Sequence, residues 1–196
     1  MRSARNPLST FGGLDHQNSM NIKQIENVRD ISGLLQVCSL PVSDLKNNES
    51  CVFFGGYDGK NLDSCVGLEI FGNVALLRSL AVSPSNQRKG KGRVLVAYAE
   101  DFCKSKGVQF VYLLTSTASS YFSSLGYIAV SRDVVPDAIK STTLYSSVCP
   151  GSATVMFSNR AQGEQGVQAD GATRRGLTPA LYSTSNKGDL INYATI

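Results

Sequence analysis

The feature that most constrains this chain is a short glycine-rich basic segment, residues 87–92, with the sequence QRKGKG. It follows an apolar run at 75–82 and precedes a helical pattern that starts near Arg93. A strand, such a turn and a helix in this order can bind phosphate, because the turn aims unpaired backbone N–H groups at one point and the helix adds its positive N-terminal end. Glycine lets the phosphate oxygens approach closely, since a Cβ would block them. The segment therefore predicts a phosphate-binding turn, and a solvated basic loop is the alternative.

Two familiar phosphate motifs do not fit this segment. A Walker loop needs Ser or Thr directly after its lysine to hold magnesium, and Gly92 follows Lys91 here. A dinucleotide fingerprint needs a third glycine, but residues 93–95 are Arg, Val and Leu. The segment does fit Gln-x-x-Gly-x-Gly, and in this it resembles the acyl-CoA pyrophosphate signature of the GCN5-related N-acetyltransferases (GNAT).

Composition narrows the class of protein. The 196 residues are 42% hydrophobic and contain no long apolar run, which favours one soluble domain without a transmembrane helix. The five cysteines show no Cys-x-x-Cys spacing, and His16 is the one histidine. We therefore expect no metal site, no disulfide framework and no histidine-dependent triad, and we expect a cytoplasmic protein with reduced thiols.

The flanks differ from the middle of the chain. Residues 1–19 lack the apolar core of a secretory signal, and residues 159–196 are rich in small and polar residues with little periodicity. We expect both flanks to be disordered and residues 20–158 to form the domain. The net charge of +4 is modest, and aromatic residues do not interleave with the basic cluster at 88–93. This argues against a nucleic-acid partner. We also expect no membrane partner, and the sequence leaves a homodimer possible.

Hydrophobic periodicity and turn signals predict an order of βααβββαβαββ. The helix after Asn27 has Asp30 in its first turn, and Asp58-Gly59 and Gly72-Asn73 mark the turns between strands. The expected helices span 28–38, 42–47, 92–106 and 117–125, and the expected strands span 21–25, 51–57, 64–71, 74–82, 108–114, 127–130 and 153–157.

Further segments narrow the resemblance, which covers roughly residues 20–158. They are Leu40-Pro41, 67–69 (GLE), 76–82 (LLRSLAV), 113–118 (LLTSTA), 121–127 (YFSSLGY), 135–139 (VPDAI), 149–153 (CPGSA) and Met156. Together they resemble the arsenic-resistance N-acetyltransferases, which are related to the glutamate N-acetyltransferase domain. The resemblance implies an α/β (α+β) fold of the GNAT type. Its mixed central sheet would splay between the strands at 75–82 and 108–114, with helices on both faces.

The same resemblance implies where acetyl-CoA would bind. The pantetheine arm would pair with the backbone of Leu80, Ala81 and Val82, and a backbone N–H there would stabilise the oxyanion. Thr115 would contact the cofactor or the substrate. The pyrophosphate would lie on the turn formed by Gln87, Arg88, Lys89, Gly90, Lys91 and Gly92. The three basic side chains of this turn would add charge, or they are simply solvated.

Two charged residues lie in otherwise apolar strands beside this segment. Glu69 is the candidate base, because a substrate ammonium must lose a proton before its nitrogen can attack. Arg78 is the candidate binding residue for a substrate carboxylate, arsinate or phosphinate group. The alternatives are that Glu69 simply faces outward from its strand and that Arg78 forms a structural ion pair, with Glu69 as one candidate partner.

The general acid departs from the pattern of the family. Many relatives carry a Tyr four residues before the glycine that ends the helix, and Phe122 stands at that position before Gly126. Tyr121 is the remaining candidate acid, although it lies about 100° further round a helix. A thiolate is already a good leaving group, so the loss of such an acid need not abolish activity.

The implied function is transfer of an acetyl group from acetyl-CoA to the α-amine of a small amino-acid-like substrate. An organoarsenical or phosphinate analogue of glutamate would place the protein in arsenic resistance, and ordinary acetylation of an amino acid such as glutamate is the alternative. A non-catalytic acetyl-CoA-binding module is an alternative of another class, which Phe122 and the long flanks favour.

Overall fold

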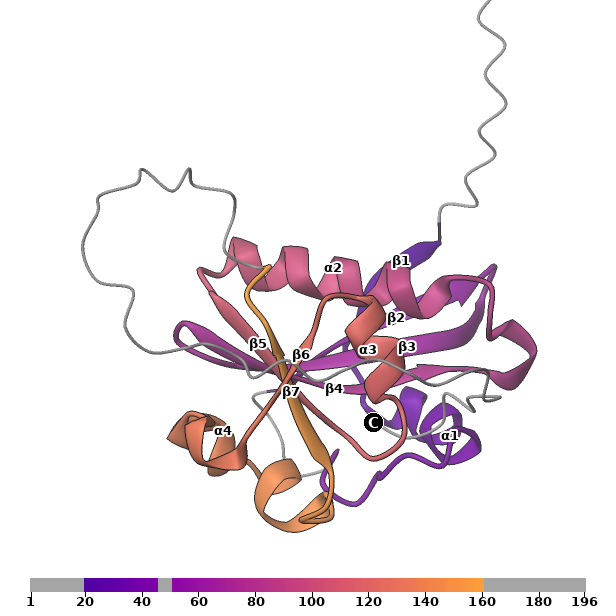
Figure 1. Ribbon diagram of the computed structural model, residues 1–196. Helices are drawn as coiled ribbons and strands as arrows, with labels where there is room; N and C mark the ends of the chain where they lie inside the picture. Colours follow the sequence, from indigo (N-terminus) through magenta and orange to yellow (C-terminus); the bar gives the residue numbers. More distant parts are fainter. Residues whose placement is uncertain (1–19, 46–50, 161–196) are drawn as a thin grey trace, which may run out of the picture.

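A seven-stranded mixed sheet forms the centre of the computed structural model, which describes residues 20–45 and 51–160 (Figure 1). The order across the sheet is β1-β2-β3-β4-β5-β7-β6. The strands are β1 (Asn21–Ile25), β2 (Cys51–Asp58), β3 (Asn61–Phe71), β4 (Val74–Val82), β5 (Phe110–Thr115), β6 (Ile128–Val130) and β7 (Thr154–Ser158).

The first four strands form an antiparallel meander, and β5 joins it by a parallel pairing with β4. The tight turns of the meander lie at Gly59 and Gly72, both with φ of 60°. That left-handed conformation suits glycine, which has no Cβ to clash. The parallel step needs a crossover, and α2 (Lys91–Ser105) supplies it.

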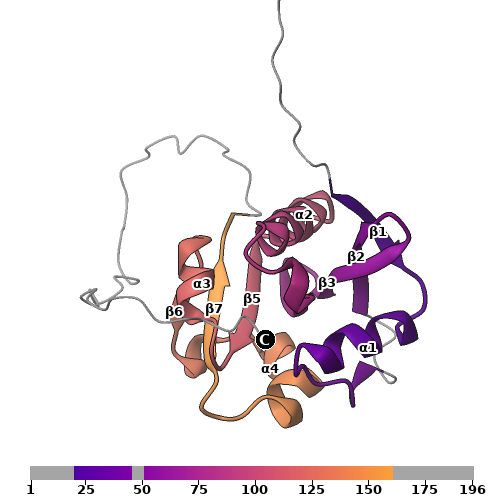
Figure 2. The same cartoon turned by 90° about the vertical axis from the view of Figure 1, so that its right-hand side faces the viewer.

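Helices cover both faces of the sheet (Figure 2). α2 lies on one face, and α1 (Arg29–Val37) and α4 (Asp137–Lys140) lie on the other. α3 (Ser119–Ser124) contacts β6 and β7. Among the described residues, no helix combines the length and the apolar character that crossing a membrane requires.

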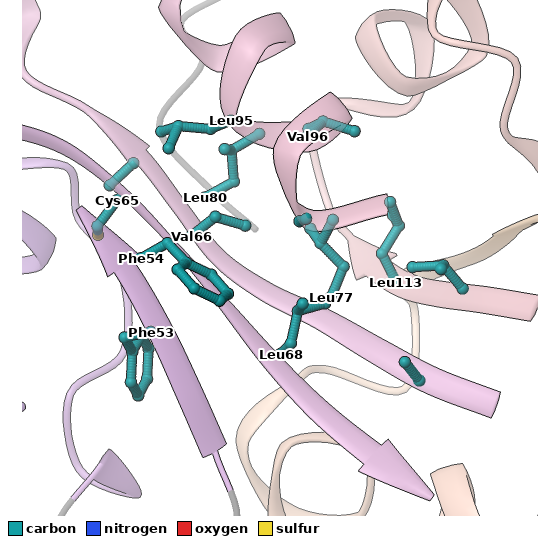
Figure 3. Close-up of a cluster of buried hydrophobic side chains, with 14 of the residues drawn as sticks. Phe53, Phe54, Cys65, Val66, Leu68, Leu77, Leu80, Leu95, Val96 and Leu113 are labelled. Carbon is teal, nitrogen blue, oxygen red and sulfur yellow. The ribbon is translucent and has the colours of Figure 1, made fainter. Parts of the chain in front are cut away.

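The main core lies between α2 and the middle of the sheet, where Val66, Leu68, Leu77 and Leu80 meet Leu95 and Val96 (Figure 3). Neighbouring residues of a strand point to opposite faces. Phe54 therefore packs edge-on against Tyr98 and Phe102 of α2, whereas Phe53 points to the face that carries α1.

The predicted strands are all present, with shifts at their ends. β3 begins at Asn61 rather than 64, and β5 begins at Phe110 rather than 108, because Val108 N–H instead donates to the carbonyl of Cys103 at the end of α2. The predicted helix at 42–47 lies partly outside the described residues. Between β6 and β7 the structure adds elements that the prediction lacked: a 3-10 turn (Arg132–Val134), α4 and a π-helical turn (Leu144–Val148).

Candidate active site

A bulge in β4 and a gap beside it create the first part of the site. The ladder between β4 and β5 covers residues 74–76 and 110–112, so the rest of β4 separates from β5 as predicted. On its other side β4 shifts register against β3: Gly67 pairs with Arg78, but Cys65 pairs with Ala81. Ser79, inside this bulge, has φ of 53°, an uncommon conformation for a residue with a side chain. The strand edge at residues 80–82 therefore faces the gap rather than β5.

The glycine-rich turn forms the second part of the site. Arg88 and Gly90 both have positive φ, at 61° and 79°, and Gly90 directly precedes α2. No side chain caps this end of α2, whose first N–H groups have no partner within the helix. The turn thus ends in a helix N-terminus that can receive an anion.

A pocket of about 210 Å³ joins these two parts. The strand edge contributes Leu80 and Val82, and the turn and the helix contribute Gln87, Gly90, Gly92 and Arg93. Ala118 and Tyr121, at the start of α3, close the opposite side. Sequence analysis missed Arg93 and Ala118. The position of Arg93 in the first turn of the predicted helix was a usable signal, whereas Ala118 reaches the pocket only because α3 folds over it.

The lysines of the turn make contacts elsewhere. Lys91 forms an ion pair with Asp63 of β3, and Lys89 Nζ lies 3.0 Å from Asn86 Oδ1. Both lysines line a second cavity of about 370 Å³, which Tyr57 and Asp58 also border. The charged ends of both lysines therefore lie at the second cavity, and the first pocket is lined by Arg93 instead.

The two glycines of the turn are required for different reasons. A Cβ on Gly90 would meet nothing within 4 Å, so its positive φ is the constraint. A Cβ on Gly92 would lie 2.7 Å from the Tyr121 hydroxyl oxygen, so this glycine leaves room for the tyrosine. The clearance for phosphate oxygens that the sequence predicts at these glycines stays a prediction.

A buried ion cluster lies on the opposite face of the sheet. Arg78 Nη1 is 2.8 Å from Glu69 Oε1, and Arg78 Nη2 is 2.6 Å from Asp44 Oδ2. The exposed fractions of Arg78, Glu69 and Asp44 are 1%, 3% and 5%. Burial acts to lower the pKa of Arg78, but hydrogen bonding to Glu69 and the charge of Asp44 outweigh it, so the pKa is raised. Arg78 therefore stays charged and occupied by two carboxylates.

The comparisons with known proteins agree with this geometry. The family model described as the acetyltransferase (GNAT) family matches residues 23–127. The chain belongs to the GNAT acetyltransferase family. An uncharacterized N-acetyltransferase from Chlorobaculum tepidum is 33% identical over 87 residues, which are 44% of this chain and 56% of that relative. The match thus spans little more than half the length of the relative.

Solved GNAT structures share the fold. N-acetylglutamate synthase from Neisseria gonorrhoeae, complexed with coenzyme A and N-acetyl-glutamate, is 19% identical with a TM-score of 0.59, over 70% of this chain and 34% of that chain. The ribosomal-protein-S18-alanine N-acetyltransferase from Escherichia coli is 21% identical with a TM-score of 0.52, over 70% of this chain and 90% of that chain. The predicted GNAT fold is confirmed, and at these identities the likeness extends to the fold alone.

Arg78 and Glu69 form an ion pair, which is the structural alternative stated for Arg78 on sequence grounds. Arg78 contacts both Glu69 and Asp44, and its role in binding a substrate carboxylate stays a prediction. Glu69 points into the domain, so the alternative of an outward-facing Glu69 is wrong. Sequence analysis missed Asp44, because it lies on an irregular segment after α1 and no local pattern links it to Arg78.

Two aromatic neighbours on α3 of the GNAT domain have different surroundings. Phe122, at the position where many relatives carry the acid, is fully buried in the core. The Tyr121 ring packs edge-on against Phe122 with centroids 5.2 Å apart and borders the pocket. Its hydroxyl lies beside Gly92, at the end of the pocket that the glycine-rich turn forms. The role of Tyr121 as an acid stays a prediction.

Thr115 and the cysteines make structural contacts in this GNAT domain. Thr115 Oγ1 accepts a hydrogen bond of 2.9 Å from Ala118 N–H, at the start of α3. All five cysteines, each among the described residues, are free thiols. Burial raises the pKa of Cys51, Cys65 and Cys103 to about 12 and also raises the pKa of Cys149, which disfavours thiolate chemistry. Within residues 20–45 and 51–160, no three His, Cys, Asp or Glu side chains gather to hold a metal ion.

Proposed function

We propose that this GNAT domain transfers the acetyl group of acetyl-CoA to the amine of a small acceptor. The observation that carries the proposal is the pocket joining the strand edge at Leu80 and Val82 to the N-terminus of α2. Such a pocket offers an extended hydrogen-bonding edge at one end and an anion site at the other, which suits the pantetheine arm and the pyrophosphate of acetyl-CoA.

Each part of the pocket has a distinct role in this proposal. The N–H groups at the start of α2, together with Arg93, hold the pyrophosphate. The edge of β4 at residues 80–82 orients the pantetheine arm and thus the thioester. A backbone N–H beside the bulge stabilises the oxyanion of the tetrahedral intermediate. Holding amine and thioester together supplies much of the acceleration without a covalent enzyme intermediate.

For the acceptor, we propose the α-amine of a small amino-acid-like compound. The support is the resemblance of residues 135–139 and 149–153 to the arsenic-resistance branch, which favours an organoarsenical or phosphinate analogue of glutamate. Glutamate itself is the alternative. The two carboxylates on Arg78 remove the one residue-level reason for a carboxylate on the acceptor. The buried Phe122 favours a second candidate, an acetyl-CoA-binding module without turnover.

A thiol-release assay tests the proposal. The full chain is given acetyl-CoA with glutamate, other amino acids, phosphinothricin and arsinothricin. We expect turnover with at least one amine, and preference for the arsenical or the phosphinate would support the detoxifying role. Tight acetyl-CoA binding with no turnover of any amine would support the non-catalytic module instead.

The matched variant for the cofactor site is Gly90→Glu. The substitution would place a non-glycine residue in a left-handed backbone conformation, and its side chain would bring a negative charge to the proposed phosphate end of the pocket. We expect acetyl-CoA binding, measured by calorimetry, to be lost. An unchanged affinity would contradict the assignment of the turn.

A further inference from the structure

The buried ion cluster of Asp44, Glu69 and Arg78 contains one more negative than positive charge. Two carboxylates share a single guanidinium, and all three side chains are almost fully buried. Burying an uncompensated charge is costly, so a site of this kind favours a bound cation. One monovalent cation would balance the three residues.

Asp44 has the oxygen that such a cation would meet. Its Oδ2 pairs with Arg78, whereas its Oδ1 is buried and has no hydrogen-bond partner within residues 20–45 and 51–160. Buried carboxylate oxygens normally have partners, so an orphaned one indicates a missing donor. A primary ammonium has three N–H donors and a positive charge, and it meets both requirements.

The position of the cluster connects it to the reaction. Arg78 directly precedes Ser79 of the β4 bulge, beside which the thioester would lie. A Cβ on Gly67 would lie 2.6 Å from the ring of Phe53 and 3.1 Å from Cγ of Arg78, so these side chains share the face that carries α1. The pocket, by contrast, is lined by residues at the start of α2 and at the start of α3. The cluster therefore lies on the face of the sheet opposite the pocket and directly precedes the bulge in the chain.

The geometry points to Asp44 as the residue that binds the ammonium group of the acceptor. Asp44 Oδ1 accepts a hydrogen bond from the ammonium, while Arg78 holds the other oxygen of the carboxylate. The site selects an acceptor by its cationic nitrogen rather than by a carboxylate. This inference depends on the proposed acetyl transfer, since it names the group that recognises the acceptor.

The test compares amines with their hydroxyl analogues. The probes are L-glutamate and L-phosphinothricin, each paired with the analogue in which a hydroxyl replaces the α-amine. Affinity for the full chain saturated with coenzyme A is measured by calorimetry. We expect the wild type to prefer at least one amine over its hydroxyl analogue by about tenfold or more, and Asp44→Asn to abolish that preference.

Controls separate binding from folding. Glu100→Gln neutralises another buried carboxylate, on α2, and should keep the preference. Acetyl-CoA affinity reports whether Asp44→Asn is folded, and Asp44→Ser serves as a second variant if it is not. The inference is wrong if the wild type shows no preference for either amine, or if Asp44→Asn or Asp44→Ser keeps it. Turnover in the thiol-release assay would still support the proposed function in that case.

Discussion

At the scale of single residues, the environment of Arg78 decides what this side chain can do. A guanidinium on the surface of a cleft could bind an anionic substrate, but Arg78 is 1% exposed and contacts Glu69, Asp44 and the Ser79 hydroxyl. Its single positive charge is therefore shared between two buried carboxylates. Removing it would leave both carboxylates uncompensated, which is far more costly than losing an exposed ion pair.

Arg78→Ala should consequently act on stability. We expect it to lower the free energy of unfolding by about 3–5 kcal/mol, measured by urea denaturation, because it leaves two buried charges unpaired. Arg78→Lys should cost less, since it keeps the charge but cannot contact both carboxylates in the same way. If Arg78→Ala were as stable as the wild type and raised KM for a carboxylate acceptor alone, the substrate-binding role would be supported instead.

At the scale of elements, α2 and α3 meet where the cofactor would bind. Gly92 in the first turn of α2 and Tyr121 in α3 are in close contact, and both line the pocket. The missing Cβ of Gly92 is what accommodates the tyrosine hydroxyl. The relative placement of the two helices is thus coupled to the shape of the phosphate-binding end.

This coupling predicts a suppressor. Gly92→Ala should weaken acetyl-CoA binding about tenfold, because the new methyl group displaces the tyrosine ring into the pocket. In a Tyr121→Phe background the nearest remaining ring atom would be 3.5 Å from the methyl group. In that background, Gly92→Ala should weaken acetyl-CoA binding by about threefold or less. A double-mutant cycle by calorimetry measures the coupling between the two substitutions. Additive effects of the two substitutions would contradict the coupling.

At the scale of the whole molecule, a buried acid on α2 links stability to pH. Glu100 is 8% exposed, and burial raises its pKa from 4.5, although hydrogen bonding to Tyr127 and the charge of Arg160 act to lower it. The protonated form is therefore favoured in the folded state. Its contribution to stability is fully present below the unfolded-state pKa and is lost as pH rises through the raised folded-state pKa.

Glu100→Gln should remove this pH dependence, because glutamine does not ionise. The stability of the variant relative to the wild type should be higher at about pH 7 than at about pH 4, because ionising the buried wild-type carboxyl costs stability as pH rises. Thermal melting of both proteins at both pH values measures how the stability difference between variant and wild type changes with pH. If the stability difference between variant and wild type were the same at both pH values, Glu100 would titrate alike in the folded and unfolded chains.

The sequence by itself determined the features that depend on neighbours along the chain. Alternating apolar residues gave the strand positions, and the segment QRKGKG after an apolar strand gave the turn, the start of α2 and the GNAT resemblance. These features are local, because strand and helix periods and glycine conformations act over a few residues.

Only the tertiary structure decided which side chains meet across elements. Asp44 forms an ion pair with Arg78, and Asp63 forms one with Lys91, although the two residues of each pair lie far apart in the chain. Ser79 has a positive φ without being glycine, so the β4 bulge has no sequence signature. Such contacts depend on how α1, the sheet and α2 pack together. The sequence around a charged residue does not indicate whether its partner is a substrate or a buried carboxylate. The glycine-rich turn could therefore be predicted from the sequence, whereas the surroundings of Arg78 could not.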